Sequence, residues 1–129
     1  MTVQTETDFA NAQCMTSLDG VSYAWTATKT LTLQNGWTNA PFDTSIATRK
    51  VVSGIVFFKC AIGSGTFELV FKLLPGVRPA HTVYLPVDLC DATNGRLEIN
   101  ASGNVAVEPE APFSDAQCFT SLDGVSYSP

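Results

Sequence analysis

The chain has 129 residues, enough for one domain with a buried core. Its N-terminus is acidic and polar, so no signal peptide is predicted, and its apolar runs are shorter than the roughly 20 residues of a membrane span. Charged residues make up only 15% of the sequence, against about 25% in typical soluble domains, so part of the apolar surface is expected to be buried between subunits. The net charge is −5 and no basic run is longer than Arg49–Lys50, which argues against nucleic-acid binding.

An internal repeat is the first feature along the chain. Residues 9–23 and 113–127 are identical at twelve of fifteen positions, with an offset of 104 residues (113 − 9). Such a repeat is typical of a module that is stacked or concatenated. We therefore predict an N-terminal arm over residues 1–26, carrying a copy of the terminal strand motif, and one domain over residues 27–129. The repeat points to assembly rather than to catalysis.

The body of the chain alternates apolar and polar residues with period two, which predicts half-buried strands. The side chains expected in the core are Phe58, Phe67, Leu69, Phe71, Leu85, Leu97 and Ile99. Turns are expected at Gly63–Gly65, Pro75–Gly76, Asn94–Gly95, Ser102–Gly103 and Asp123–Gly124. No window has helical periodicity, so the fold class is all-β: a single jelly-roll-like β-sandwich of roughly seven to nine strands, with an N-terminal arm and no helix longer than about two turns.

The cysteines are scattered without a close-spaced pair, and His81 is the only histidine, so no zinc site is expected. Reduced thiols are the default expectation, with Cys60 as a buried free thiol. Cys14 and Cys118 hold the same place in the two copies, and a disulfide between them is the alternative.

Catalytic and cofactor chemistry are not expected. His81 follows an Arg-Pro turn, and Asp19 and Asp123 precede glycines in tight turns, where a carboxylate accepts a backbone N–H. The segment Asp88–Asn94 could offer oxygens to calcium, but it lacks regular ligand spacing and is better explained as a solvated loop. No paired carboxylates stand at a credible site, so we predict a non-enzymatic protein without cofactor or metal.

Four motifs occur in a characteristic order: Leu31–Trp37, Arg49–Lys59, Leu74–Pro79 and Ser121–Tyr127. This order resembles a small β-sandwich module of tailed-bacteriophage virion surface proteins, of the tail-fibre C-terminal or decoration type. The resemblance implies synthesis in the host cytoplasm, a place on the virion surface, a homotrimer, and contact with other virion proteins such as the major capsid protein.

Two functions remain open from the sequence. The first is a capsid decoration or cement protein that assembles through its N-terminal arm, with candidate interface residues Phe9, Cys14, Leu18, Val21, Tyr23 and Trp25. The alternative is a carbohydrate-binding receptor module at a fibre or spike tip. Candidate ligand or partner contacts are Trp37, Arg49, Lys50 and Arg78. For Trp37 and Trp25, packing in the core or at a subunit interface is favoured over sugar stacking, whereas surface ion pairs and partner contacts remain equally open for the cations.

The C-terminal copy is expected to close the sandwich, with Leu122 and Val125 packed inward. One module offers one such place, so the N-terminal copy is expected to dock elsewhere, either on a second edge of its own sandwich or on a neighbouring subunit. The neighbouring subunit is favoured, because strand addition to an exposed edge would also cover that edge.

Overall fold

The computed structural model describes residues 28–110 and 112–129, so the predictions made for residues 1–27 lie outside the described residues. Over the described ranges the chain forms short β-strands, two 3₁₀ turns and one short helix. The elements are β1 (Lys29–Thr30), β2 (Thr38–Asn39), η1 (Pro41–Asp43), β3 (Thr48–Val52), β4 (Ile55–Lys59), β5 (Ala61–Gly63), β6 (Leu69–Lys72), β7 (Val83–Asp88), η2 (Cys90–Ala92), β8 (Asn94–Ile99), β9 (Asn104–Pro109), α2 (Phe113–Cys118), β10 (Thr120–Ser121) and β11 (Ser126–Tyr127).

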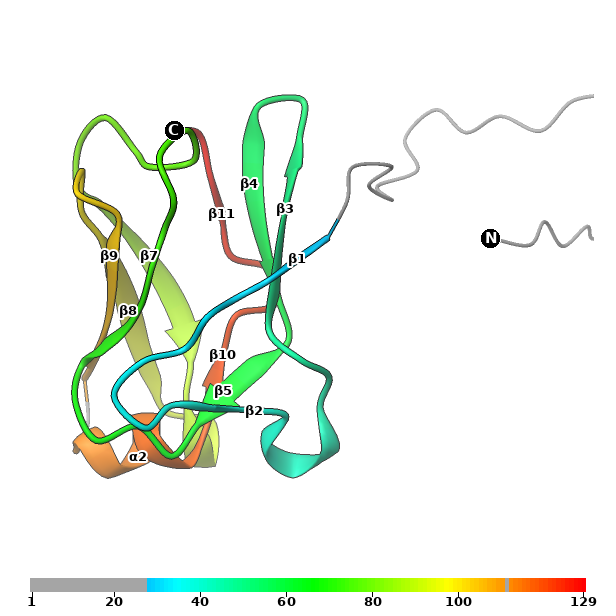
Figure 1. Cartoon of the computed structure of the whole chain (residues 1–129). Helices are drawn as coiled ribbons and strands as arrows, with labels where there is room; N and C mark the ends of the chain where they lie inside the picture. The colour runs from blue at the N-terminus through cyan, green and yellow to red at the C-terminus, as the bar shows by residue number, and fades with distance from the viewer. Residues whose placement is uncertain (1–27, 111) are drawn as a thin grey trace, which may run out of the picture.

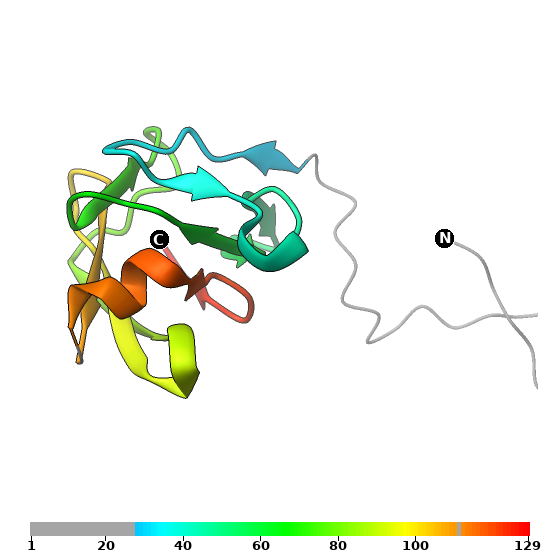
Figure 2. The ribbon, with the colours of Figure 1, turned by 90° about the horizontal axis from the view of Figure 1, so that it is seen from below.

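The strands form two layers. One layer is the antiparallel sheet β6-β9-β8-β7, and the other combines the ladders β1-β3-β4-β11 and β10-β5-β2. The second layer is continuous because Leu122 N–H donates to the Cys60 carbonyl and Phe58 N–H donates to the Val125 carbonyl across the gap between its ladders. Figure 1 shows the two layers face to face, and Figure 2 shows α2 at one end beside β10. The predicted all-β sandwich is confirmed, and α2, at six residues, stays under two turns.

The core lies between the layers. Phe58 on β4 and Phe71 on β6 meet edge to face with their ring centroids 5.5 Å apart, and both rings are buried. Leu97 and Ile99 on β8 are fully buried against them. These four positions confirm the predicted core. Leu122 and Val125 are also buried, as expected for the C-terminal copy.

Three core predictions need correction. A β-bulge between Leu69 and Phe71 interrupts the alternation, so Val70 and Phe71 are both buried while Leu69 is half-buried. Phe67 precedes the strand and is 60% exposed, so its predicted burial is wrong. Leu85 is half-buried because β7 is an edge strand, covered on one side only.

The predicted turns are partly right. Gly76 and Gly103 have φ of 96° and 88°, as tight turns at Pro75–Gly76 and Ser102–Gly103 require. The predicted turn at Asn94–Gly95 is wrong, since these residues begin β8 and the hairpin is made by η2. The predicted hairpin at Gly63–Gly65 is also wrong, because this segment connects β5 to β6 in the other layer.

The strand predicted through Cys60 breaks at that residue. Cys60 has a φ of 75°, separates β4 from β5, and is a half-buried free thiol rather than a fully buried one. Ile62 nevertheless returns to the core. Breaks of this kind explain why more and shorter strands are seen than the sequence predicted.

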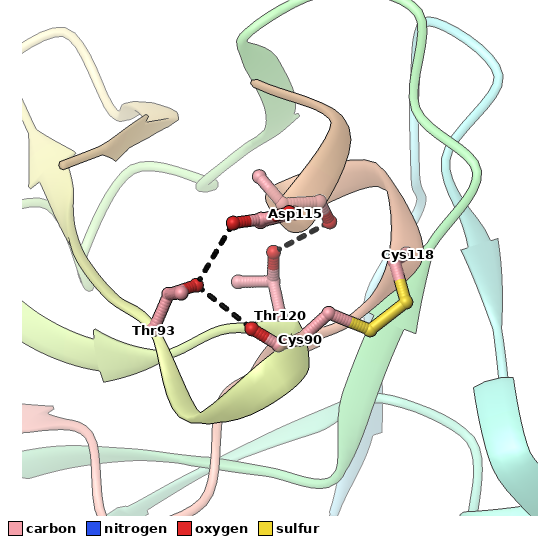
Figure 3. Close-up of a disulfide and its surroundings, with 6 residues drawn as sticks. Cys90, Thr93, Asp115, Cys118 and Thr120 are labelled. Carbon is pink, nitrogen blue, oxygen red and sulfur yellow. Dashed lines mark hydrogen bonds between the residues drawn. A yellow bond between two sulfur atoms is a disulfide. The ribbon is translucent and has the colours of Figure 1, made fainter. Parts of the chain in front are cut away.

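The thiol prediction is wrong for two cysteines. Cys90 in η2 and Cys118 at the end of α2 form a disulfide with their Cα atoms 5.7 Å apart. Cys118 is therefore already paired in this structure, and the alternative bond between Cys14 and Cys118 is not formed. Figure 3 shows the polar contacts beside this disulfide. Thr93 Oγ1 donates to the Cys90 carbonyl and lies 3.2 Å from Asp115 Oδ2, while Thr120 Oγ1 donates to the Ala116 carbonyl.

Helix α2 was not predicted, because six residues are too few for a helical apolar stripe to appear. Among the described residues, no helix has the length and apolar character needed to cross a membrane.

Candidate binding face

The outer side of the sheet β6-β9-β8-β7 gathers polar and aromatic side chains on neighbouring strands. The β7–β8 register places Tyr84 opposite Glu98 and Pro86 opposite Arg96, and the β8–β9 register places Arg96 opposite Glu108. Residues at these positions point away from the core because successive side chains alternate across a sheet. Pro86 is compatible with β7 because this strand pairs only with β8 in its sheet. We call the surface formed by Tyr84, Pro86, Arg96, Glu98 and Glu108 the outer face.

Arg96 is the centre of this surface. Its Cζ lies 4.4 Å from the centroid of the Tyr84 ring, in cation–π contact, and its Nε donates to Glu108 Oε2. The Glu108 carboxylate raises the pKa of Arg96, so the guanidinium stays charged. The two contacts hold the guanidinium in one orientation, although the ion pair itself is exposed and contributes little to stability.

Glu98 adds a second carboxyl beside Glu108. Its pKa is raised above the usual value, first by desolvation, then by a hydrogen bond to Glu108 and by repulsion from that carboxylate, while Arg96 acts in the opposite direction. The outer face therefore carries two carboxyls close together and one cation that directly pairs with one of them.

Two adjoining surface depressions border this cluster. The first, of about 430 Å³, is lined by Tyr84, Pro86, Gly95, Arg96, Glu108, Pro109 and Glu110. The second, of about 440 Å³, shares Pro86, Gly95 and Glu110 and adds Val87, Asp88, Asn94 and Asp123. A Cβ at Gly95 would lie 2.8 Å from the Glu108 carbonyl oxygen, so glycine is needed where β8 passes β9. Both depressions are wide open to solvent, so a ligand held there would remain partly exposed.

The arrangement suits recognition of hydroxyl-rich ligands. Carboxylates accept hydrogen bonds, a guanidinium donates several in one plane, and an exposed tyrosine offers an apolar ring with a polar tip. Tyr84 is 52% exposed as a residue, and the Arg96 guanidinium covers part of its ring. Within the described ranges, no group of three or more His, Cys, Asp or Glu side chains could hold a metal ion.

Comparison with known proteins gives one informative match. No family model and no curated protein matches the chain. The structure is similar to the crystal structure of the receptor binding protein (gp15) of Listeria phage PSA, with a TM-score of 0.62 and 18% sequence identity. The match covers 92% of this chain and 71% of the phage protein. At this identity the likeness shows a shared fold.

Trp37, a candidate ligand contact, lies in the core. Its ring is 4% exposed, packs edge to face on Phe113, and donates from Nε1 to the Phe67 carbonyl. A Cβ at Gly65 would overlap the ring, so a glycine there is what admits it. Of the two explanations offered by the sequence, core packing is the one the structure shows, and the indole presents no face for stacking on a sugar.

The three cationic candidates lie apart from the outer face. Arg78 Nε donates to the Leu73 carbonyl beside the β8–β9 hairpin, which gives it a structural role. Arg49 and Lys50 lie on β3 in the other layer. Arg49 lines a separate depression of about 360 Å³ with Lys29 and other residues near the β1–β6 side of the sandwich. The structure therefore does not bring the four candidates Trp37, Arg49, Lys50 and Arg78 together.

The remaining candidates fall in two groups. Phe9, Cys14, Leu18, Val21, Tyr23 and Trp25 lie outside the described residues. His81 and Asp91 are exposed, and Asp91 has a φ of 57° in the η2 turn, as expected for a turn-forming residue.

The outer face was not among the predicted sites, although the sequence holds a signal for it. A hairpin turn at Ser102–Gly103 pairs Asn100 with Asn104, and counting back along both strands places Arg96 opposite Glu108. A two-residue turn at Ser102–Gly103 would instead pair Ala101 with Asn104 and shift the register by one residue, so the predicted turn alone does not fix the pairing. The signal is the alternation of apolar residues, since only the observed register places Leu97 opposite Val107 on the buried side. This register brings the polar side chains of Arg96 and Glu108 together on the outward side. The β7–β8 pairing could not be predicted, because its turn was placed at Asn94–Gly95.

Proposed function

We propose that the protein is a bacteriophage virion surface protein that binds a receptor on the host cell. The observation that carries this proposal is the fold likeness to a phage receptor binding protein, which extends over most of both chains. The ordered motifs in the sequence support the same family. The capsid decoration function, which was the first hypothesis from the sequence, has no comparable support.

We place the receptor contact on the outer face and assign it a saccharide. The tyrosine ring can cover the apolar face of a sugar ring, and the guanidinium and carboxylates can bond its hydroxyls. Four acidic side chains, Glu108, Glu110, Asp88 and Asp123, line the two depressions, against the single cation Arg96. This balance favours a neutral or amine-bearing saccharide over a phosphorylated or sulfated one.

Binding without hydrolysis is part of the proposal. Retaining glycosidases hold their two carboxyl groups about 5–5.5 Å apart, and inverting enzymes hold them farther apart, so that the reacting centre lies between them. Glu98 on β8 and Glu108 on β9 instead project from the same face of one sheet, so they do not flank a reacting bond from two sides. Arg96 also engages Glu108 directly. The pair is therefore better placed to accept hydroxyl hydrogens from one side.

The disulfide is compatible with this location. Disulfides persist in oxidising surroundings, which include virion surfaces. A thiol pair made in a reducing cytoplasm would become oxidised as Cys90–Cys118 after the particle leaves the cell. Assembly as a homotrimer remains a proposal, based on the low charge fraction and the family resemblance, and a native mass three times that of the chain is the expected result.

The binding proposal is tested with the whole protein and immobilised oligosaccharides. We expect glucosamine oligomers or neutral N-acetylated oligomers to bind, and dextran sulfate not to bind. Tyr84→Ala and Arg96→Ala should each weaken binding by about tenfold, which corresponds to roughly 1.4 kcal/mol. Phe57→Ala and Lys59→Ala, which change exposed residues of β4 in the other layer, are the matched controls and should leave binding unchanged.

Equal losses in the control variants, or selective binding of the sulfated polymer, would contradict the outer-face assignment. Electron microscopy of labelled virions separates the two functions: label at the tail tip is expected for receptor binding, and label over the capsid surface would instead support decoration.

A further inference from the structure

The structure shows what the C-terminal repeat does in the fold. Residues 113–127, which we call the closing segment, comprise α2, β10 and β11 and complete the second layer of the sandwich. The closing segment packs on β4, β5 and η2 and also contacts Trp37, Gly65 and Val77. We call these elements and residues together the receiving site.

The strand part of the closing segment is held by backbone and side-chain contacts. Thr120 pairs with Ile62 on β5, and Tyr127 pairs with Val56 on β4. Leu122 is fully buried. Further contacts come from Asp123 Oδ1, which accepts from Cys60 N–H at 2.8 Å, and from Tyr127 O–H, which donates to the Val77 carbonyl at 2.6 Å.

The helical part is held as closely. Phe113 packs edge to face on Trp37, and Gln117 Nε2 donates to the Gly65 carbonyl at 2.7 Å. Cys118 completes the disulfide with Cys90. The receiving site therefore recognises a specific order of side chains.

The N-terminal copy carries that order. The side chains that make these contacts recur in the N-terminal copy at the same spacing, where they are Phe9, Gln13, Cys14, Thr16, Leu18, Asp19 and Tyr23. The two segments differ at three positions only: Ser114, Asp115 and Phe119 are replaced by Ala10, Asn11 and Met15. Position 114 is exposed. At position 115, Asp115 Oδ2 lies 3.2 Å from Thr93 Oγ1, and the asparagine of the N-terminal copy also carries a side-chain oxygen that can occupy this place. A methionine keeps an apolar contact with Phe42, since thioethers pack well on aromatic rings.

We propose that residues 9–23 are a second closing segment, and that they fill the receiving site of a neighbouring copy of this chain when its own closing segment is displaced. This inference is independent of the proposed receptor binding. The sequence alone predicted that the N-terminal copy adds to an exposed edge. The structure favours the receiving site instead, because the side chains of the N-terminal copy can form every contact that the closing segment makes there. The Cys14 thiolate would then attack the sulfur of the neighbouring copy's Cys90, break the Cys90–Cys118 bond and release the Cys118 thiolate, so that thiol–disulfide exchange links the two chains without an external oxidant.

A neighbouring copy is favoured over the chain's own receiving site. β1 and β11 lie on opposite edges of one ladder, about 14 Å apart at three strand spacings. Six residue steps separate Tyr23 from Lys29 (29 − 23), a reach of about 20 Å when fully extended. A connection within the chain would use most of this reach, because it must also pass over outward side chains such as Phe57. A second copy has no such limit.

The test uses the full-length chain with matched substitutions in the two copies. Leu122→Asp places a charge at a fully buried position and displaces the C-terminal copy, whereas Leu18→Asp makes the same change in the N-terminal copy. After mild oxidation, disulfides are mapped by mass spectrometry, linked chains are counted on non-reducing gels, and folding is followed by thermal unfolding.

We expect Leu122→Asp to remain folded and to form a Cys14–Cys90 bond between chains, with at least about ten times the yield seen in the double variant. Leu18→Asp should retain Cys90–Cys118 and single chains. The double variant should lose cooperative unfolding. As a second probe that keeps Leu122, Cys118→Ser removes the disulfide that ties the closing segment to η2, so the N-terminal copy can compete for the receiving site and should form the interchain Cys14–Cys90 bond after mild oxidation. The proposal is overturned if Leu122→Asp unfolds as completely as the double variant, or if the Cys14–Cys90 bond is absent or forms only within one chain.

Discussion

The two layers of the sandwich are built on different principles. In β7, β8 and β9 the pairing runs without a shift, so inward residues such as Leu97 enter the core while outward residues such as Arg96 stay on the surface. In the opposite layer the strands break at Cys60, which has a φ of 75°, and again at Leu122–Val125. The regular layer can therefore vary its outer side chains without disturbing the core, whereas the broken layer depends on the closing segment.

The largest effect is expected where the two layers meet. Phe71 is 1% exposed and contacts Phe58 across the core, so Phe71→Ala should lower the free energy of unfolding by about 3–5 kcal/mol. Phe67→Ala is the control, because that ring is 60% exposed and its loss should cost no more than about 0.5 kcal/mol. Chemical denaturation measures both. A loss below about 1 kcal/mol for Phe71→Ala would show that the layers do not meet there.

The next effect concerns the disulfide that ties the closing segment to η2. Cys90 and Cys118 are 28 residues apart, and opening a loop of that size should lower the free energy of unfolding by about 3–4 kcal/mol. Cys90→Ser and Cys60→Ser can be compared by denaturation under oxidising conditions. The second variant changes a free thiol and should cost less. Equal losses would mean that the disulfide does not stabilise the broken layer.

Parts of both layers could be predicted from alternation. It identified Leu97 and Ile99 on β8 in the regular layer and Phe58 on β4 in the broken layer, because no break or bulge falls within these two strands. It failed around β6, because Phe67 precedes the strand and a bulge between Leu69 and Phe71 shifts the alternation, and a bulge leaves no mark in an alternating sequence. The outer face was missed because its members are far apart along the chain, and a misplaced turn at Asn94–Gly95 hid half of the register.

A smaller effect is expected at Tyr127 in the closing segment. Its hydroxyl donates to the Val77 carbonyl, and burial raises its pKa to about 12. Tyr127→Phe should cost about 1 kcal/mol at neutral pH. The pKa of this hydroxyl is 10 in the unfolded chain and about 12 in the folded protein, so between these pH values only the folded protein keeps the proton. The free energy of unfolding should therefore fall as the pH rises through that window. Tyr127→Phe should remove this fall, and an unchanged alkaline profile would contradict the assignment.

The smallest effect on stability is expected on the outer face. Glu98 has a raised pKa in the folded protein, so the folded state binds more protons than the unfolded state just above pH 4.5. Stability should therefore fall as the pH rises from about 4.5 towards the raised value, and Glu98→Gln should flatten this fall. Denaturation at pH 4 and pH 7 tests the prediction. A steeper fall in the variant would show that Glu98 is not the responsible group.

The most direct test of receptor binding by the outer face is a nuclear magnetic resonance titration of the isotope-labelled whole protein with the saccharide that binds best. We predict that chemical-shift changes concentrate on backbone amides of β7, β8 and β9, around Tyr84, Arg96 and Glu108, while those of β3 and β4 stay in place. Changes centred on β3 and β4, or no saturable change with any saccharide tested, would contradict the account.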